Sequence, residues 1–173
     1  MRLLAISGSL RAHSSNGELV RALATLAAPA IQVEVYAGLA DLPAFNPDLD
    51  EDGMTPPPAV QTLRRAVADA DGLVISSPEY AHGVPGALKN ALDWLVSGPE
   101  MVSKRVGLLN ASPRSVHAQQ SLAETLRTMS ATLVERACLA LPVSGRGLNA
   151  ESIVVDVELR EQLQRVLHAM ASR

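Results

Sequence analysis

"RLLAISGSLRAHSSNGEL", residues 2–19, is the stretch that decides the fold we predict for this chain. Its first six residues contain the unbroken apolar run "LLAI", which is typical of a strand covered on both faces of a parallel sheet. The serine-rich segment that follows ends in Ser15 and Glu18, which match the Ser-x-x-Glu capping box. We therefore expect a buried strand, a polar loop, and a helix that starts near Asn16.

The alternation of strand and helix continues along the chain. Apolar runs predict strands at residues 2–7, 32–37, 72–77, 105–111 and 133–141. Apolar residues at helical spacing predict helices within residues 19–26, 88–95, 122–129 and 159–170, with a weaker helix at 59–70. This order predicts an α/β fold: a flavodoxin-like three-layer sandwich, with a five-stranded parallel sheet in the order 2-1-3-4-5 and helices on both faces. We expect one domain over residues 1–173.

Composition excludes several classes of protein. A net charge of −3 gives no basic footprint for nucleic acid or for an anionic membrane. The single cysteine, Cys138, permits no intramolecular disulfide and lies in an apolar run, so we expect a buried, unreactive thiol and a reducing compartment. The N-terminal apolar run is too short for a signal peptide or a membrane span. These features predict a cytoplasmic protein.

Three polar loops follow the first, third and fourth predicted strands, at residues 7–16, 77–86 and 111–118. In a doubly wound sheet, ligands bind outside the carboxyl ends of the strands, where the strand order reverses. We therefore expect these loops to form one ligand site. The long irregular stretch at residues 38–57 has two interpretations, either a surface connection or a flap beside that site.

The first loop has the donors that an anion needs. A helix start offers unpaired N–H groups and the positive end of the helix dipole, contributing about 0.3–2 kcal/mol. Neutral donors and one guanidinium surround it, at Ser9, Ser14, Ser15, Asn16 and Arg11. The alternative is an ordinary capped turn with serines facing solvent. The Gly-x-Gly-x-x-Gly and Walker patterns, a loop cysteine and a strand-end aspartate are all missing, which excludes other common phosphate sites.

The second loop, "PEYAHGVPG" at residues 78–86, suits a flat heterocycle. Pro78 gives a rigid exit from the strand, and Gly83 permits backbone geometry that other residues avoid. Backbone amides between these two residues are then available to the polar edge of a ring, with Tyr80 against its rim or face. The alternative is a tight turn in which Tyr80 has no role.

Taken together, "GSLRAHSSN" and "PEYAHGVPGALKNALDW" closely resemble the NADPH-dependent FMN reductases of flavodoxin-like fold, a family that includes quinone, chromate and azo-dye reductases. The resemblance implies that Ser9, Arg11, Ser14, Ser15 and Asn16 surround the FMN phosphate. It further implies that Pro78, Glu79, Tyr80, Ala81, His82 and Gly83 wrap the isoalloxazine ring, and that Ser112 contacts its outer edge.

The third loop departs from the family pattern. Relatives have a glycine-rich segment before an Ala-Gln pair, whereas "SPRSVHAQ" keeps Ala118–Gln119 without a glycine. The bulkier Arg114 and His117 stand there instead, which changes the pocket shape that we expect for the electron acceptor. The resemblance also implies a homodimer or homotetramer.

We predict an enzyme that passes a hydride from NAD(P)H through FMN to quinones, azo dyes, chromate or free flavin, in a ping-pong sequence. No side chain is expected to act as a catalytic acid or base for hydride uptake, because the cofactor carries the electrons. The main alternative is a flavodoxin-like one-electron carrier, which the modest charge and the four aromatic residues disfavour. A metal-dependent hydrolase using His13, His82 and His117 is a further alternative, but these histidines lack the spacing of metal ligands, so we expect no metal.

Overall fold

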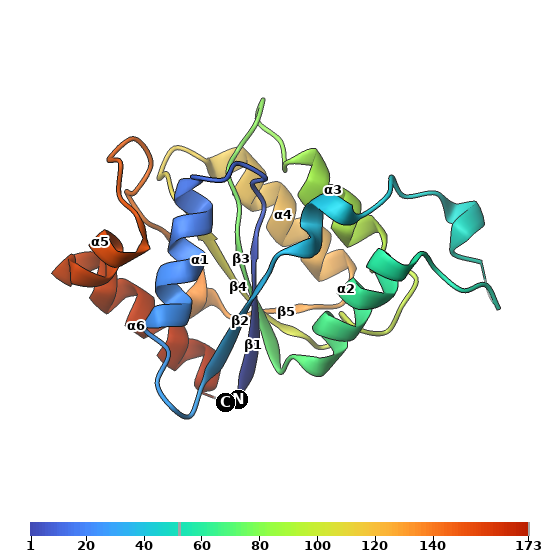
Figure 1. Ribbon diagram of the computed structural model, residues 1–173, viewed down its shortest axis with the longest axis horizontal. Coiled ribbons are helices and arrows are strands. Elements are labelled where there is room, and N and C mark those ends of the chain that lie inside the picture. The colour runs from blue at the N-terminus through green and yellow to red at the C-terminus, as the bar shows by residue number, and fades with distance from the viewer. Residues whose placement is uncertain (52, 173) are drawn as a thin grey trace.

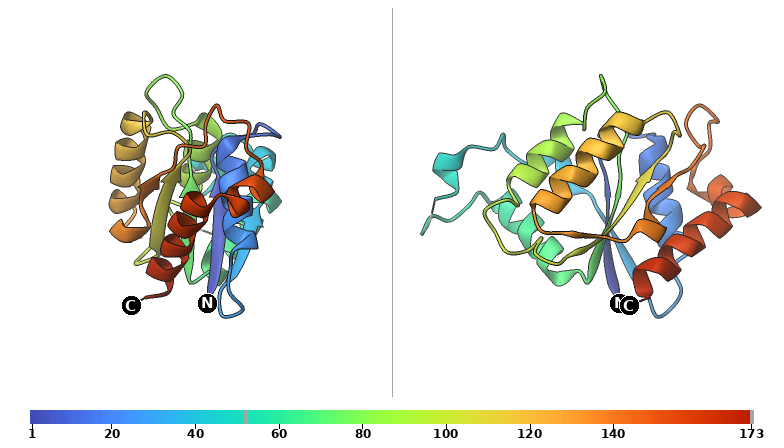
Figure 2. Two further views of the ribbon diagram at one scale, coloured as in Figure 1. Left: turned by 90° about the vertical axis from the view of Figure 1, so that its left-hand side faces the viewer. Right: turned by 180° about the vertical axis from the view of Figure 1, so that it is seen from behind.

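A parallel sheet with helices on both faces forms the protein in a computed structural model, which describes residues 1–51 and 53–172. Figure 1 views the sheet nearly edge-on, and Figure 2 shows the two helical layers from the side and from behind. The strands are β1 (Arg2–Ser7), β2 (Gln32–Tyr36), β3 (Gly72–Ser76), β4 (Arg105–Asn110), β5 (Thr132–Leu133) and β6 (Leu139–Ala140). They lie in the order β2-β1-β3-β4-β5, and β6 also pairs with β4. The predicted fold and strand order are confirmed.

The helices divide into two layers. They are α1 (Ser15–Thr25), α2 (Pro58–Asp69), α3 (Gly86–Asp93), α4 (Val116–Thr128), α5 (Ala150–Val155) and α6 (Val157–Ala171). Short 3-10 turns are η1 (Gly38–Asp41), η2 (Pro47–Leu49) and η3 (Glu135–Ala137). The sequence did not predict α5. Within the described residues, no helix is both long and apolar enough to cross a membrane.

Successive side chains of each strand enter opposite layers of the core, as the pleat of a strand requires. In β1, Leu4 and Ile6 pack with α2, α3 and α4, whereas Leu3 packs with α1, α5 and α6. Every residue of β3 is buried. The near-continuous apolar runs of the sequence therefore report strands that are covered on both sides.

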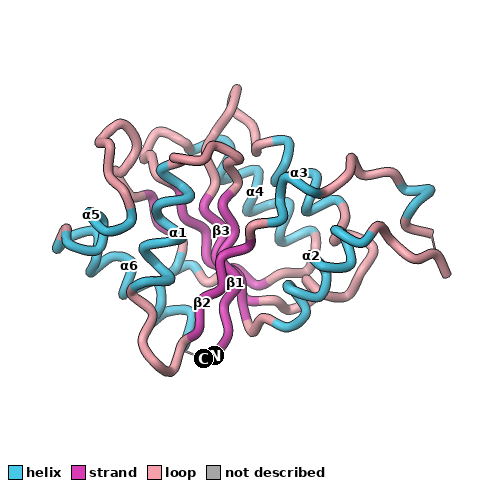
Figure 3. Tube along the Cα trace, viewed as in Figure 1, coloured by secondary structure: helices cyan, strands magenta, loops and turns pink. Residues whose placement is uncertain are grey.

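The fifth predicted strand, residues 133–141, is wrong as a continuous element. Only its two ends pair with β4, and η3 interrupts them. The turn closes through a hydrogen bond from Ala137 N to the carbonyl oxygen of Val134, 2.7 Å. It places the methyl group of Ala137 against Gly107 of β4, where a Cβ atom would lie only 2.9 Å from the Ala137 Cβ. The missing side chain at Gly107 lets the interrupted strand pack into the sheet edge. Figure 3 shows the strands in magenta between the helices in cyan.

Residues 38–51 and 53–57 leave the end of β2 and project from one flank of the molecule, outside α2 and α3 (Figure 1). The carbonyl oxygen of Pro43 accepts a hydrogen bond from Trp94 Nε1, 2.9 Å, and Asp50 pairs with Arg64 at 2.8 Å. These contacts anchor the stretch to the helical layer rather than to the loops at the carboxyl edge. The structure favours the interpretation as a surface connection.

Candidate functional site

The polar loops that follow β1, β3 and β4 meet at one edge of the sheet (Figure 1). The register brings Ser7 opposite Ser76, and Ser76 opposite Leu109, so these strands end nearly level. A cavity of about 470 Å³ lies between the loops, within the size range of small-molecule sites. It is lined by Ser9, Arg11, His13, Ser14, Ser15, Asn16, Pro78, Glu79, Tyr80, Ala111, Ser112, Ser115, Ser144 and Gly145.

Nine of the twelve predicted site residues are in that lining, and Ala81, His82 and Gly83 are not. The loop after β6 contributes Ser144 and Gly145, which sequence reasoning missed. A signal was present: this loop follows the last strand of the sheet and contains "SGRG" at residues 144–147, so it ends at the same edge. Arg114 and His117, the unusual residues of the third loop, do not line the cavity.

Helix α1 begins one residue earlier than predicted. Ser14 is the N-cap, with extended backbone (φ −92°, ψ 130°), and its Oγ accepts a hydrogen bond from Gly17 N at 3.5 Å. Ser15 is already the first helical residue. The predicted capping box is therefore wrong, because Ser14 is the last extended residue and takes the capping position.

Glu18, the other half of that predicted box, has different partners. It pairs with Arg21 at 2.6 Å and accepts a hydrogen bond from the backbone N–H of Ala150, 2.9 Å, at the start of α5. The hydrogen bond from Arg21 lowers the pKa of Glu18, and the bond from Ala150 acts in the same direction. Glu18 thus joins α1 to α5 rather than capping its own helix.

Asn16 of α1 links the end of β3 to the residue that follows β4 at the cavity floor. Its Oδ1 accepts hydrogen bonds from Ser76 Oγ, 2.9 Å, and from the backbone N–H of Ala111, 3.2 Å. The residue is only 5% exposed, yet it lines the cavity. Its amide nitrogen has no partner in the described part of the chain, which leaves two N–H donors for a ligand.

The second loop is a two-residue hairpin. Tyr80 N donates to the carbonyl oxygen of Gly83, 3.1 Å, and Gly83 N donates to the carbonyl oxygen of Tyr80, 2.9 Å. Ala81 (φ 50°) and His82 (φ 62°) form the turn, as in a type I′ hairpin. The expectation that Gly83 supplies unusual backbone geometry is wrong, because the positive φ angles fall on the two residues before it. The amides of Tyr80 and Gly83 close the hairpin, so those of Glu79, Ala81 and His82 are the ones available to a ligand.

Glu79 fixes this hairpin to helix α4. Its Oε2 accepts a hydrogen bond from the backbone N–H of Ala118, 2.9 Å, in the first turn of α4. The cap residue Ser115 makes no side-chain capping bond, so the carboxylate from the neighbouring loop takes that role. Glu79 Oε1 also lies 3.5 Å from His82 Nδ1, and the rings of His82 and His117 meet edge to face at 4.3 Å.

The donors around the cavity fit a phosphate group. The first N–H groups of α1, at Ser15 and Asn16, have no acceptor within a helix, and the positive end of the helix dipole adds to them. Arg11 supplies the cationic side chain at the rim. Ser9 Oγ lies 3.3 Å from the Tyr80 hydroxyl, which joins this donor cluster to the hairpin. The arrangement suits a ligand with a phosphate at one end and a planar polar group at the other.

The Cys138 thiol has a structural role instead of a chemical one. Burial raises the pKa of the Cys138 thiol, whose Sγ donates to the carbonyl oxygen of Val134 at 3.4 Å. The thiol therefore stays protonated and poorly nucleophilic at neutral pH.

Among residues 1–51 and 53–172, no three His, Cys, Asp or Glu side chains are grouped to hold a metal ion.

Comparison with solved structures identifies the fold class of the protein. The structure superposes on the NAD(P)H:(acceptor) oxidoreductase FerB of Paracoccus denitrificans with a TM-score of 0.73, at 22% identity over 98% of this chain and 96% of that one. A flavodoxin mutant of Pseudomonas aeruginosa gives a TM-score of 0.62 at 12% identity, over 99% and 100% of the two chains. These likenesses establish a flavodoxin-like fold.

Sequence comparison then gives the family: residues 1–146 match the NADPH-dependent FMN reductase family, and the chain belongs to it. An NAD(P)H-dependent FMN reductase of Pseudomonas aeruginosa is 30% identical over 98% of this chain and 93% of its own length. A quinone reductase of Escherichia coli is 39% identical, over 58% of this chain and 53% of its own length. The predicted family and reductase class are confirmed, and the carrier alternative is not favoured.

Proposed function

We propose that this protein uses FMN to pass electrons from NAD(P)H to quinones or similar acceptors, such as azo dyes, chromate or free flavin. One observation carries the proposal. The cavity at the carboxyl edge of the sheet combines an exposed helix N-terminus with a hairpin that has unpaired backbone amides. Family membership supplies the reaction class, and this cavity supplies the place for it.

The first loop would hold the FMN phosphate. Backbone N–H groups at the start of α1, the hydroxyls of Ser9, Ser14 and Ser15, and the amide of Asn16 are neutral donors. Arg11 adds a charged hydrogen bond, which is about twice as strong as a neutral one. Both the neutral and the charged hydrogen bonds would stabilise a bound phosphate dianion.

The hairpin would receive the isoalloxazine ring, which Pro78 through Gly83 wrap in this proposal. The amides of Glu79, Ala81 and His82 would donate to its polar edge, and Ser112 would contact its outer edge. Bound FMN supplies the reversible two-electron chemistry of that ring. Tyr80 is 52% exposed and leaves room for a second planar molecule beside the hairpin.

The side chains have few chemical tasks in this reaction. The backbone donors of the hairpin would stabilise negative charge at the edge of a bound ring, which would favour hydride transfer from a nicotinamide. Quinone reduction also needs protons, for which water and His82 are the available sources. His82 is exposed, and its Nδ1 lies 3.5 Å from Glu79 Oε1.

An absorbance experiment tests the proposal directly. The protein is loaded with FMN, made anaerobic and mixed with NADPH, and the flavin absorbance is followed with time. We expect rapid bleaching, and recovery when a benzoquinone is added. Failure to bleach without a separate reductase would instead indicate an electron carrier. Failure to bind FMN at all would overturn the site assignment.

We also propose that the chain is one FMN-binding domain that acts as a homodimer or homotetramer in the cytoplasm. Two exposed apolar side chains, Val96 and Val102, line a shallow cavity of about 500 Å³ beside α3 and α4, which supports self-association there. The single cysteine is compatible with a reducing compartment. Light scattering coupled to gel filtration measures the oligomeric state. A strictly monomeric protein at micromolar concentration would contradict the proposal.

A further inference from the structure

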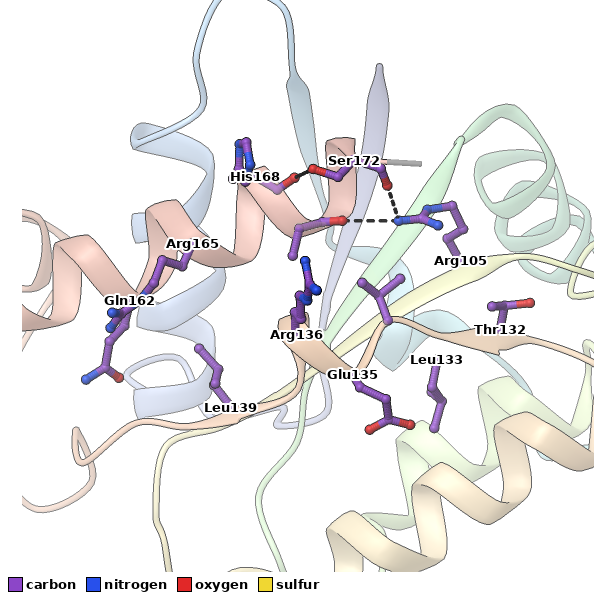
Figure 4. A pocket seen from close by; sticks show the side chains of 12 residues that line it. Arg105, Thr132, Leu133, Glu135, Arg136, Leu139, Gln162, Arg165, His168 and Ser172 are labelled. Atoms are coloured by element: carbon purple, nitrogen blue, oxygen red, sulfur yellow. Dashed lines mark hydrogen bonds between the residues drawn. The ribbon is translucent and has the colours of Figure 1, made fainter.

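A second and larger cavity, of about 950 Å³, lies at the opposite end of the sheet, where β4 and β5 begin (Figure 4). One wall comes from the interrupted edge strand and the other from the C-terminal half of α6. The lining residues are Arg105, Thr132, Leu133, Val134, Glu135, Arg136, Leu139, Gln162, Arg165, His168, Ala169 and Ser172. Within the described chain, no residue lines both this cavity and the one at the carboxyl edge.

The charge of this cavity is opposite to that of the protein as a whole. Three arginines, Arg105, Arg136 and Arg165, line it, in a chain of net charge −3. Its one carboxylate, on Glu135, is 74% exposed and turns to Arg127 of α4, 3.4 Å away. The cavity therefore has more positive than negative charge.

The three arginines differ in the contacts that they make. Arg105 donates to the carbonyl oxygens of Ala169, 3.1 Å, and Ser172, 2.7 Å, so it neutralises the negative end of α6. Arg136 and Arg165 have no carboxylate within ion-pair distance in the described part of the chain. Figure 4 shows Arg136 rising from η3 toward α6, the helix that carries Arg165.

Apolar side chains make up much of the remaining wall. Leu133 and Val134, together with Leu139, are only partly buried and are in the lining, and Ala169 closes it on the side of α6. A small inorganic anion would leave this apolar surface exposed to water. An anion with an apolar body would cover it and still reach the guanidinium groups.

The shape of the edge argues against a peptide strand as the occupant. η3 interrupts β5 and β6, so the outer edge offers two ladders of only two residues each. Such a short edge gives little main-chain pairing to an added strand.

We propose that this cavity binds organic anions in which a carboxylate, sulfonate or phosphate is attached to an aromatic or aliphatic body. The charged group would lie beside Arg136, and the body would lie on Leu133, Val134 and Leu139. Arg165, which Figure 4 shows extending toward Gln162, adds positive charge farther along the cavity. The inference stands independently of the proposed reductase function, because the two cavities are separate.

The test uses 8-anilinonaphthalene-1-sulfonate as the probe and N-phenyl-1-naphthylamine as its uncharged counterpart. Probe fluorescence is titrated with protein that holds one equivalent of FMN, so that the other cavity is filled and no free FMN competes with the probe. The double variant Arg136→Gln/Arg165→Gln removes both unpaired guanidinium groups from exposed positions, and Arg65→Gln removes the same charge from an exposed position on α2. FMN binding, measured in parallel, reports that each variant is folded.

We expect the double variant to bind the sulfonate about five- to tenfold more weakly, and each probe to bind Arg65→Gln within about twofold of the parent protein. The uncharged amine should bind the double variant and the parent equally, because it lacks the charged group. Methanesulfonate, which has the charge without the body, should not displace the probe. Equal sulfonate binding by the double variant, or displacement by methanesulfonate at equal concentration, would overturn the proposal. Failure of the parent protein to bind FMN would count against the reductase site and not against this one.

Discussion

The two ends of one sheet carry cavities with different chemistry. At the carboxyl edge, hydroxyls and backbone amides predominate, and Arg11 is the one arginine in the lining. At the amino edge, three arginines stand among leucine and valine side chains. Helices that follow parallel strands present their N-termini, with unpaired N–H groups, at the first edge and their carbonyl ends at the second. An anion therefore finds backbone donors at one edge, whereas at the other edge it needs side-chain cations.

The largest expected effect separates the two cavities. The double variant Arg11→Ala/Asn16→Ala removes one charged and one neutral donor from the carboxyl edge. Charged hydrogen bonds contribute about 1.5–3 kcal/mol, so FMN affinity should fall tenfold or more. Fluorescence quenching of FMN on titration with protein measures it, with Arg65→Ala as the matched control. An unchanged FMN affinity would remove the phosphate site from this edge. Sulfonate binding at the amino edge should stay within about twofold of the parent value.

A second prediction distinguishes the structural role of Asn16 from its ligand role. Asn16→Ala leaves the buried Ser76 hydroxyl and the Ala111 amide without an acceptor, so the free energy of unfolding should fall by about 1–3 kcal/mol. Asn16→Asp keeps the acceptor oxygen but replaces the amide donor by a negative charge. Urea denaturation of the FMN-free protein should show most of the stability restored in Asn16→Asp, while FMN binding stays weak. Recovery of FMN binding in that variant would contradict the role of the amide nitrogen.

The hairpin offers a third and smaller effect. Ala81 has φ 50°, a conformation that costs a residue with a Cβ atom about 1 kcal/mol. Ala81→Gly should therefore raise the free energy of unfolding by up to about 0.5–1 kcal/mol, as measured by chemical denaturation. Gly83→Ala is the matched control, because a Cβ atom there meets only ordinary contact with the Tyr80 carbonyl oxygen at 3.5 Å. A lower free energy of unfolding for Ala81→Gly, or a loss of more than about 1 kcal/mol for Gly83→Ala, would contradict the assigned turn.

The smallest expected effect concerns pH. The hydrogen bond from Arg21 lowers the pKa of Glu18 in the folded protein. A lowered pKa adds stability above the pKa of the unfolded chain, and this contribution is lost as the pH falls below about 4. Glu18→Gln should thus reduce the free energy of unfolding by a few tenths to about 1 kcal/mol at pH 6, with a smaller difference at pH 3. If the stability difference between Glu18→Gln and the parent protein grew toward low pH, it would contradict a stabilising Glu18–Arg21 ion pair.

Much of the carboxyl edge was predictable because it depends on local chemistry. The residues that line that cavity follow directly after apolar strands, and parallel strands bring their ends to one edge whatever the details of packing. The error at the start of α1 was one residue, since Ser14 and Ser15 both suit a cap and only the backbone angles choose between them. Gly83 misled for a similar reason: glycine permits a positive φ angle but does not require it.

The amino edge was not predictable from the same kind of pattern. Arg105, Arg136 and Arg165 come from the start of a strand, a 3-10 turn and a helix, and no motif or spacing relates them. Their proximity depends on how the interrupted edge strand packs on Gly107 and how α6 lies across it. Sequence analysis interpreted residues 133–141 as one strand and so had no reason to expect a cavity there.

The sequence by itself determined the strand order, the family and the edge of the sheet where we propose that a phosphate and a flat ring bind. Those properties follow from apolar periodicity and from donor-rich loops that are contiguous in the chain. Only the tertiary structure decided that Asn16 Oδ1 and the amides of Tyr80 and Gly83 are already bonded, and that a second, cationic cavity exists. Such properties depend on contacts between residues far apart in the chain, whose distances are set by packing and not by local conformational preference.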